Sequence, residues 1–460
     1  MKAVLLIDFG STYTKITAVD LDTCDLLGTA ASYTTVESDI NHGLAHALEI
    51  LERKIGHVDF AETYACSSAA GGLKMISIGL VPELTVQAAK EASLGAGAKI
   101  MKTYSYQITK SDIREINELE PDIILLSGGT DGGNSETILH NAKKLREVTW
   151  DAPIIIAGNR SCVDECEEIL QEKQVFVCEN VMPELGKLNI LPTQELIREI
   201  FLKKIVQGKG LTEAKDLVSD IIMPTPSAML TAMELLADGC EGESGIGNLI
   251  GVDLGGATTD IYSIADGSPT GANTIFKGIQ EPYAKRTVEG DIGMRYSIGG
   301  ILEAGGVQEI AKRAGLSVEK VNQMVKHLND HKDLIPEDME YESLDYGLAA
   351  MAVETAVHRH AGTIEQVYTP MGEAYLQTGK DLRSVENVIV TGGALIHARE
   401  VTKIASYALY RKEHPEALLP EKANIWVDDK YILASMGLLS KVYPKAALDI
   451  MKREITNYGN

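Results

Sequence analysis

Two segments about half the chain apart share an arrangement of residues that could bind a chain of phosphates. The first, LLIDFGSTYTKI, spans residues 5–16, and the second, IGVDLGGATTDI, spans residues 250–261. In each, an apolar run ends in an aspartate, Asp8 or Asp253, and a turn of small residues leads into a second apolar run. An aspartate that ends a strand is held rigidly at the sheet edge, and glycines let backbone N–H groups approach an anion.

This repeat predicts a polyphosphate site with a magnesium ion. Because Mg²⁺ favours carboxylate, water and phosphate oxygens, Asp8 and Asp253 are the expected catalytic and metal-holding residues, acting through water, and Asp253 could orient the attacking water. One such hairpin alone is better explained as a polar turn, whereas two matched copies favour hairpins that face one cleft. The residues expected to hold the phosphates are Gly10, Ser11, Thr12, Thr14, Lys15, Gly255, Gly256, Ala257, Thr258 and Thr259.

A third segment, VIVTGGALIHARE, spans residues 388–400 and reads as a strand, two glycines and a helix. Gly392, Gly393 and Ala394 would let a flat adenine or a ribose approach the backbone, beside the N–H groups of a helix N-terminus. Taken alone this is equally well a tight turn. Its place after the two hairpins favours the nucleotide interpretation.

The elements that must position these residues can be expected from hydrophobic spacing. An α/β fold is predicted, with a β/α alternation over residues 74–178 that indicates a parallel sheet covered on both faces. Residues 238–247 read as a linker or loop, and residues 288–377 as mainly helical, with helical spacing over 348–371. Further strands are expected at 3–8, 16–19, 28–33, 62–67, 249–253, 260–264, 388–391 and 425–427, and helices at 41–55, 193–206, 226–237 and near the C-terminus.

Composition limits the possible functions. The 460 residues contain 43 Lys plus Arg and 66 Asp plus Glu, a net charge of −23, so a surface this acidic disfavours nucleic-acid binding. No apolar run is long enough to span a bilayer and the N-terminus lacks a signal-peptide core, so no membrane association and a cytoplasmic location are expected. Six cysteines do not make a disulfide scaffold, although Cys162 and Cys166 could lie close together.

The three segments, in this order, resemble the actin, Hsp70 and sugar-kinase superfamily of ATPases. The resemblance implies two related, ribonuclease H-like lobes with ATP in the cleft between them. It matches the superfamily's phosphate motifs to residues 8–15 and 253–260, its adenosine motif to residues 392–394, and its first connecting helix to MPTPSAML, residues 223–230.

A narrower resemblance rests on five motifs that together cover the chain. LLIDFGSTYTK, ILLSGGTDGGNSE, RTVEGDIGMR, RHAGT and VTGGALI resemble the glutamate mutase MutL family, which is unrelated to the mismatch-repair protein of that name. It implies an ATP- and Mg²⁺-dependent reactivating factor for an adenosylcobalamin-dependent mutase, with glutamate mutase as the expected partner. Gly290 and Arg359 join the expected nucleotide-binding residues; Glu289 and Asp291 could close on the nucleotide or cap a helix, and residues 358–360 could contact adenine or form a solvated helix face.

The sequence departs from the superfamily at two places. Hsp70-type members carry a carboxylate beside the proline of the connecting helix, where this chain has Met223 or Thr225, so hydrolysis should be slow or another group must help. Residues 72–190 exceed a plain lobe and are expected to be an inserted α/β domain that docks the client. The lobes are then 1–71 with 191–245, and 246–460.

The loop SGGTDGGNSE, residues 127–136, stays open to three interpretations: an anion-binding loop, the first half's counterpart of VTGGALI, or a simple loop at the carboxyl edge of a parallel sheet. Two other functions also stay open. A small-molecule kinase would need an acceptor pocket with a base, and a nucleotide-binding assembly protein would work without useful turnover.

Overall fold

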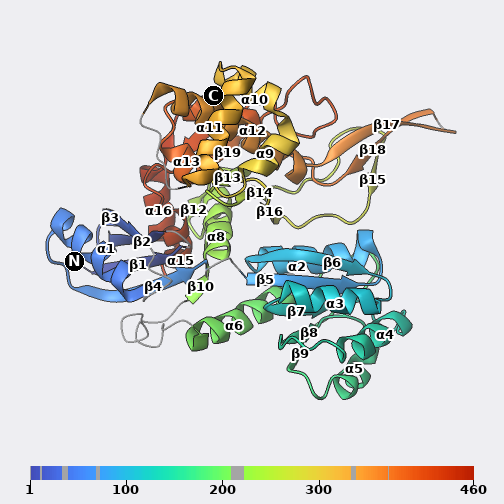
Figure 1. Ribbon diagram of the computed structural model, residues 1–460. Coiled ribbons are helices and arrows are strands. Elements are labelled where there is room, and N and C mark those ends of the chain that lie inside the picture. The colour runs from blue at the N-terminus through green and yellow to red at the C-terminus, as the bar shows by residue number, and fades with distance from the viewer. Residues whose placement is uncertain are drawn as a thin grey trace. The chain divides into compact units, whose positions relative to one another are not determined.

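A computed structural model of the protein describes residues 2–10, 13–33, 40–68, 73–208, 222–332, 338–370 and 372–459 (Figure 1). The chain divides into two compact units. The first comprises Met1–Thr231 with Ala434–Ala446, and the second Ala232–Leu433 with Ala447–Asn460.

A five-stranded sheet forms around the N-terminal strand of the first unit. Its order is β10-β4-β1-β2-β3, with β1, β2 and β3 antiparallel and β1, β4 and β10 parallel. All seven residues of β1 are buried, as expected of a central strand covered on both faces. The strands are β1 (Ala3–Phe9), β2 (Tyr13–Asp20), β3 (Asp25–Tyr33), β4 (Phe60–Ser67) and β10 (Ile222–Pro224).

Helices of the first unit pack closely on this sheet. Helix α1 (Ile40–Ile55) lies on β2 and β3. Helix α8 (Thr225–Asp238) follows β10 directly, and α15 (Leu433–Ser440) crosses it so closely that a Cβ at Gly437 would lie 1.9 Å from the Ala228 carbonyl oxygen.

A second, entirely parallel sheet of the first unit has the order β6-β5-β7-β8-β9 and shares no strand with the first. Helices α3, α4 and α5 cover one face through an apolar core that includes Ile78, Leu126 and Ile156, while α2 packs with α6. The elements are β5 (Leu73–Gly79), a π-helical turn (Pro82–Val86), α2 (Gln87–Gly95), β6 (Ala98–Ser105), α3 (Lys110–Leu119), β7 (Ile123–Leu126), α4 (Glu136–Leu145), β8 (Ile154–Ile156), α5 (Val163–Ile169), β9 (Val175–Val177) and α6 (Leu191–Gly208).

The second unit repeats the topology of the first sheet. Its order is β16-β14-β13-β19-β20-β21, with β13, β14 and β16 antiparallel and β13, β19 and β20 parallel. The strands are β13 (Leu249–Leu254), β14 (Thr259–Ile264), β16 (Ala284–Glu289), β19 (Asn387–Thr391), β20 (Asn424–Val427) and β21 (Thr456–Asn457). The expected duplication is therefore present as two α/β sheets of matching strand order and direction.

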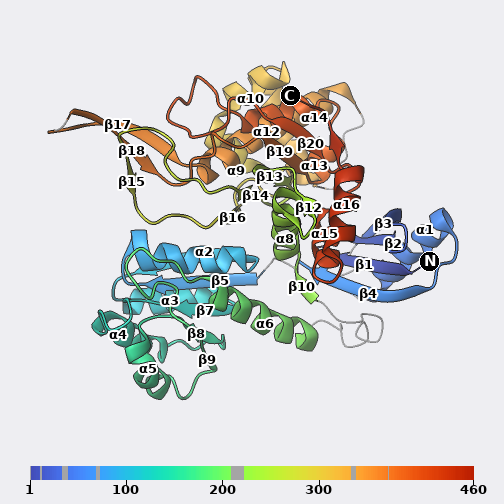
Figure 2. The ribbon, with the colours of Figure 1, turned by 180° about the vertical axis from the view of Figure 1, so that it is seen from behind.

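Helices and a separate three-stranded arm complete the second unit (Figure 2). Helix α12 is buried along much of its length and packs with α9, α10 and α14. The helices are α9 (Ile298–Gly305), α10 (Val307–Ala314), α11 (Val318–Asp330), α12 (Met339–His360), α13 (Gly393–Ile396), α14 (Val401–Ala405) and α16 (Pro444–Glu454), and the arm has the order β15 (Thr274–Lys277), β18 (Gly372–Thr378), β17 (Thr363–Thr369).

One expectation about elements was wrong, and one segment is more ordered than expected. The helix expected over 348–371 ends at His360, and β17 and β18 occupy residues 363–378. Gly362 lies so close to the backbone of Gly379 that a Cβ there would approach it to 2.6 Å, and the following TIEQVYT is rich in β-forming residues. The expected linker 238–247 contains a short hairpin of β11 (Gly239–Cys240) and β12 (Glu243–Ser244).

Candidate nucleotide site

In the first hairpin, strand β1 continues one residue past Asp8, to Phe9. In the β1–β2 ladder Asp8 is opposite Lys15, and Phe9 is opposite Thr14. The Gly10 N–H donates to the carbonyls of Asp8 (3.0 Å) and Tyr13 (3.1 Å). A Cβ at Gly10 would lie 2.4 Å from the Tyr13 oxygen, so this tight turn requires glycine.

The Asp8 carboxylate is buried and held by two neighbours. Thr225 Oγ1, at the start of α8, donates to Asp8 Oδ1 at 2.6 Å, and Cys66 Sγ donates to the same oxygen at 3.4 Å. Burial and the nearby Asp8 charge raise the pKa of the Cys66 thiol well above its usual value, so Cys66 remains a neutral donor. Thr225, where the sequence lacks the expected carboxylate, therefore orients Asp8.

The second hairpin presents its turn to a supporting segment. The carbonyl of Gly255 accepts from the Met294 N–H (3.1 Å), and the carbonyl of Gly256 accepts from the N–H groups of Arg295 and Tyr296 (2.8 Å each). The Ala257 carbonyl accepts from Ser297 Oγ at 2.7 Å. Because the C=O and N–H of a trans peptide point in opposite directions, the N–H groups of the residues that follow these carbonyls are directed away from residues 294–297. This arrangement suits an anion.

The two aspartates of the second hairpin have different surroundings. Asp253 and Asp260 are opposite each other in the β13–β14 ladder. Asp260 is paired with the buried Arg286, at 2.8 Å from Nε, and its charge is thereby balanced. Asp253 receives a longer hydrogen bond from the Tyr431 hydroxyl, at 3.5 Å.

The third motif lies against Asp253 within the second unit. Thr391 is opposite Asp253 in the β13–β19 ladder. Gly392 has φ +97°, and a Cβ there would lie 2.4 Å from the Leu254 oxygen and 2.8 Å from Asp253 Oδ1. No heavy atom lies within 4 Å of a Cβ built on Gly393, which leaves its backbone approachable.

Helix α13 supplies less than expected. It has only four residues, and the N–H groups of Leu395 (2.9 Å) and Ile396 (3.0 Å) both donate to the Gly392 carbonyl. The expectation that a helix N-terminus offers unpaired N–H groups here is therefore wrong for these two. Ala394 packs partly buried against the core of the unit.

Arg359 lies near the second turn but its guanidinium is occupied. Its Nη1 pairs with Glu289 Oε2 (2.8 Å) and with Asp291 Oδ1 (2.9 Å). Ser297 Oγ, which donates to Ala257, also lies 3.3 Å from the Gly290 carbonyl, so this group adjoins the turn. Glu289 is in a strand and does not cap a helix.

The two histidines beside Arg359 do not form one face with it. His360 is fully buried, and its ring nitrogens share hydrogen bonds with the hydroxyls of Thr287 and Ser263, each at 2.8 Å. Burial lowers the pKa of His360 well below its usual value, and Lys285 and Lys380 lower it further. His358 stacks edge-on with His414, so the expectation of one shared solvated or adenine-binding face is not met.

Other predicted residues are accounted for as follows. Thr259 was expected to donate to phosphate, but its buried hydroxyl donates to the Ile292 carbonyl at 2.9 Å, so that expectation is wrong. Thr14 is buried within β2 and Lys15 is partly buried. Ser11 and Thr12 lie outside the described residues.

Sequence reasoning missed a buried carboxyl beside this motif. Asp428 follows β20 and accepts from the N–H groups of Ile432 (2.9 Å) and Leu433 (3.1 Å) and from Thr391 Oγ1 (3.2 Å). Burial raises the pKa of Asp428 to about 6 despite these hydrogen bonds. The only signal was a pair of aspartates directly after the predicted strand 425–427.

The SGGTDGGNSE loop follows β7, at the carboxyl edge of the parallel sheet. Asp131 Oδ1 accepts from Asn180 Nδ2 (2.9 Å) and from the Arg160 N–H (3.1 Å), and Asn159 Oδ1 accepts from the Gly132 N–H (2.9 Å). The interpretation of this loop as the counterpart of VTGGALI is wrong, because β4 occupies the place of β19 in the first sheet. Its position is that of the third interpretation, a loop at the edge of the sheet.

Cysteines and acidic side chains form no metal cluster in the parts of the chain that the structure describes. Cys162 and Cys166 are both buried in the core of the parallel sheet, and burial raises the pKa of Cys166 to about 12. Asp8 in the first unit and Asp253 in the second each offer carboxylate oxygens, the type of ligand that Mg²⁺ favours. No helix among the described residues has the length and apolarity to cross a bilayer.

The duplicated sheets, each with an aspartate at the same place in its hairpin, define an α/β protein of the actin-like ATPase class. Within that class the chain belongs to the MutL protein family, whose model matches residues 4–455. Protein MutL of Clostridium tetanomorphum is 48% identical over 460 residues, which cover 98% of this chain and 99% of that relative.

Solved structures with a similar chain trace are more distant. Nucleotide-free acetone carboxylase has a TM-score of 0.39 at 14% identity, over 95% of this chain and 70% of that chain. Component A of Acidaminococcus fermentans (R)-2-hydroxyglutaryl-CoA dehydratase has a TM-score of 0.34 at 10% identity, over 97% of this chain and 100% of that chain. Ligand-bound xylulose kinase from Lactobacillus acidophilus has a TM-score of 0.35 at 11% identity, over 99% of this chain and 93% of that chain. These TM-scores are too low to define the fold, which rests on the strand orders.

Proposed function

We propose that this protein is an ATP-dependent reactivating factor for an adenosylcobalamin-dependent mutase, with glutamate mutase as its client. The observation that carries the proposal is the duplicated hairpin, with Asp8 and Asp253 at equivalent places in two sheets of a MutL-family chain. ATP hydrolysis would supply the free energy that loosens a damaged cobalamin for exchange with an intact one.

The proposed nucleotide-binding residues have distinct roles. The backbone N–H groups of residues 256–258 would donate to phosphate oxygens, and Gly392, Gly393 and Ala394 would receive the adenosine. Mg²⁺, when bound with ATP, would balance the charge of the phosphates. Gly10, Ser11, Thr12, Thr14, Lys15, Gly255, Gly290 and Arg359 complete the proposed set.

The two aspartates would divide the work at the phosphates. Asp8, fixed by Thr225, would hold the water shell of the metal. Asp253 would orient the attacking water and receive its proton. Since neither Met223 nor Thr225 is a good proton acceptor, we expect slow turnover, which suits a factor that acts once per damaged client.

We further propose that the lobes are residues 1–71 with 191–245 and residues 246–460, and that residues 72–190 form an inserted domain. The separate parallel sheet of β5 to β9 supports this division.

The direct experiment is recovery of turnover by an inactivated glutamate mutase. The mutase carrying damaged cobalamin is mixed with this protein, ATP, Mg²⁺ and free adenosylcobalamin, and product formation is followed. Recovery should require hydrolysable ATP and should fail with a non-hydrolysable analogue. No recovery, together with phosphoryl transfer to an added small molecule, would favour a kinase. Nucleotide-dependent sedimentation without recovery would favour an assembly protein.

A further inference from the structure

The three-stranded arm of the second unit extends away from the helices of that unit (Figures 1 and 2). Strands β17 and β18 are antiparallel from Thr363–Thr378 to Thr369–Gly372, and β15 adds in parallel to β18. Strand β17 lies at the edge of this sheet. At its base the Ile364 N–H donates to the Glu416 carbonyl (2.9 Å), and beyond that contact its outer backbone groups have the geometry that accepts a further strand.

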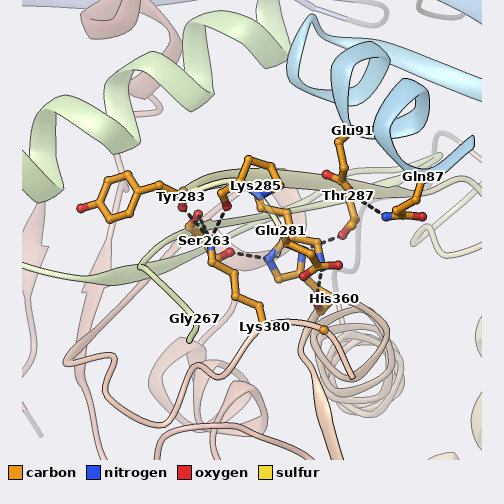
Figure 3. Close-up of polar contacts among 12 residues, drawn as sticks. Gln87, Glu91, Ser263, Gly267, Glu281, Tyr283, Lys285, Thr287, His360 and Lys380 are labelled. Atoms are coloured by element: carbon orange, nitrogen blue, oxygen red, sulfur yellow. Dashed lines mark hydrogen bonds and ion pairs between the residues drawn. The ribbon is translucent and has the colours of Figure 1, made fainter. Parts of the chain in front are cut away.

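The base of the arm is fixed by buried polar contacts. Gln377 is fully buried, and its Nε2 donates to the carbonyls of Gly267 (3.0 Å) and Gly379 (2.9 Å). The buried Lys380 ammonium donates to the carbonyls of Tyr283 (2.6 Å) and Pro282 (2.8 Å), and its side chain passes over Gly267 (Figure 3). These contacts hold the arm in one orientation on its unit.

Strand β16 of the six-stranded sheet, which begins directly after Tyr283, is also held by a buried lysine. The Lys285 ammonium donates to the His360 carbonyl and pairs with Glu281, each at 2.7 Å (Figure 3). An arm on so rigid a base is pre-organised, which lowers the entropy lost when a partner binds.

One face of the arm carries exposed aromatic side chains. The ladder pairs Gln366 with Tyr375 and Tyr368 with Glu373, so these four side chains share a face, which we call the tyrosine face. Tyr368 is 83% exposed and Tyr375 39% exposed. Tyrosines held rigid and open to solvent are typical of interface hot spots.

The charge of the arm restricts what can cover this face. The tyrosine face carries Glu373, and the strand pairings place the other charged side chains of the arm, Glu365 and Lys277, on its opposite face. The whole chain carries a net charge of −23, so a second copy, an anionic membrane and a nucleic acid would all be repelled. Arginine is the complementary side chain, since its guanidinium can stack on tyrosine and pair with a neighbouring carboxylate.

We propose that the tyrosine face is a docking surface for a partner protein that presents an arginine- and lysine-bearing face. The inference rests on the proposed function, in that the partner is the client mutase. It moves the main client contact from residues 72–190, where the sequence led us to expect it, to the arm.

The test compares variants of the full chain for binding to immobilised glutamate mutase and for reactivation. Tyr368→Ser with Tyr375→Ser should weaken binding at least about tenfold, as loss of two hot-spot tyrosines does. Glu373→Lys should slow association and reduce the dependence of binding on salt. ATPase activity without mutase and the melting temperature should stay unchanged in both variants.

Matched controls separate the arm from other surfaces. Tyr106→Ser removes a 58% exposed tyrosine of the inserted sheet, and Tyr458→Ser removes a 56% exposed one near the C-terminus. Asp59→Lys makes the same change in net charge at an exposed site elsewhere. None of these should change mutase binding if the arm docks the client.

The outcomes are distinct. Normal reactivation by both arm variants, or a loss confined to Tyr106→Ser, would overturn the arm proposal and leave the proposed function intact. An arm variant that only changes the oligomeric state would show a surface for a second copy and would also overturn it. A wild-type chain that neither binds nor reactivates mutase would overturn the proposed function and the arm proposal with it.

Discussion

The first sheet and its copy in the second unit have the same strand order but different chemistry at their edges. In the first, Lys15, Asp8, Cys66 and Met223 stand side by side on four neighbouring strands. In the second, Asp260, Asp253 and Thr391 occupy the first three places, and Asp428 follows the next strand.

The comparison shows that the two halves share a strand order, while the equivalent aspartates have different surroundings. Asp8 is buried and accepts one short hydrogen bond, from Thr225, and a longer one from Cys66. Asp253 is half-buried, and its ladder partner Asp260 is paired with Arg286. In the second half, the carboxyl of Asp428 follows β20, the third of the parallel strands, and hydrogen bonds from two backbone N–H groups hold it in place. In the first half, the residue after the third parallel strand, β10, is Thr225, which has a hydroxyl and no carboxyl.

The largest expected effect is on ATP hydrolysis, and it tests whether the two hairpin aspartates are equivalent. Asp8→Asn and Asp253→Asn should each lower ATP hydrolysis by roughly 10²-fold or more, because each removes charge that balances the metal. Nucleotide binding through backbone N–H groups should survive in both. Hydrolysis is measured as phosphate release, with Asp25→Asn, an exposed residue at the start of β3, as the control. A full rate in only one variant would show that the hairpins are not functional equivalents.

A second test compares the glycines of the third motif. Gly392→Ala should lower the free energy of unfolding by about 2 kcal/mol, because its backbone is left-handed and the new Cβ would contact Asp253 and Leu254. Gly393→Ala has open space around its Cβ and should leave stability unchanged. Chemical denaturation measures the first effect. A weakened ATP affinity in Gly393→Ala alone would sharpen the assignment of the adenosine to this turn.

The pH dependence of the free energy of unfolding tests whether Asp428 is a buried carboxyl with a raised pKa. Its pKa of about 6 in the folded protein lies above its usual value, so the folded state retains this proton longer than the unfolded state and stability falls as pH rises from about 4 to 6. Asp428→Asn removes this loss. Its free energy of unfolding relative to wild type should therefore rise by about 2 kcal/mol between pH 4.5 and 7.5. A constant difference across this range would contradict the buried, proton-holding carboxyl.

The smallest effect is expected at Thr225. Thr225→Val keeps the shape but removes the hydrogen bond to Asp8, and hydrolysis should fall about tenfold, the usual value of a hydrogen bond to a charged group. Thr225→Ser keeps the hydroxyl and should retain most of the rate. If valine and serine behave alike, the hydroxyl does not orient Asp8, and the two halves differ less than their contacts indicate.

The sequence predicted the frame well because its signals are local. The hairpins after Asp8 and Asp253, the parallel alternation of residues 74–178 and the turn at Gly392 all appear in the structure. Contacts that depend on tertiary packing could not be predicted. The bond of Thr225 to Asp8 joins residues far apart in sequence, and the burial of Thr259 and His360 depends on strands and helices packed around them. The arm was missed because helical spacing in residues 348–360 continued by chance into β17.

The Cys66 thiol, which donates to Asp8, can be used to measure local opening of the first sheet. Cys66 is completely buried, and its raised pKa keeps it out of the thiolate form that alkylating reagents require. Its labelling therefore has to wait until β4 or β10 separates locally from the sheet, so the labelling rate measures how often this edge opens. A ligand that holds Asp8 more firmly against its neighbours should slow the labelling of Cys66, and this can be measured without following turnover.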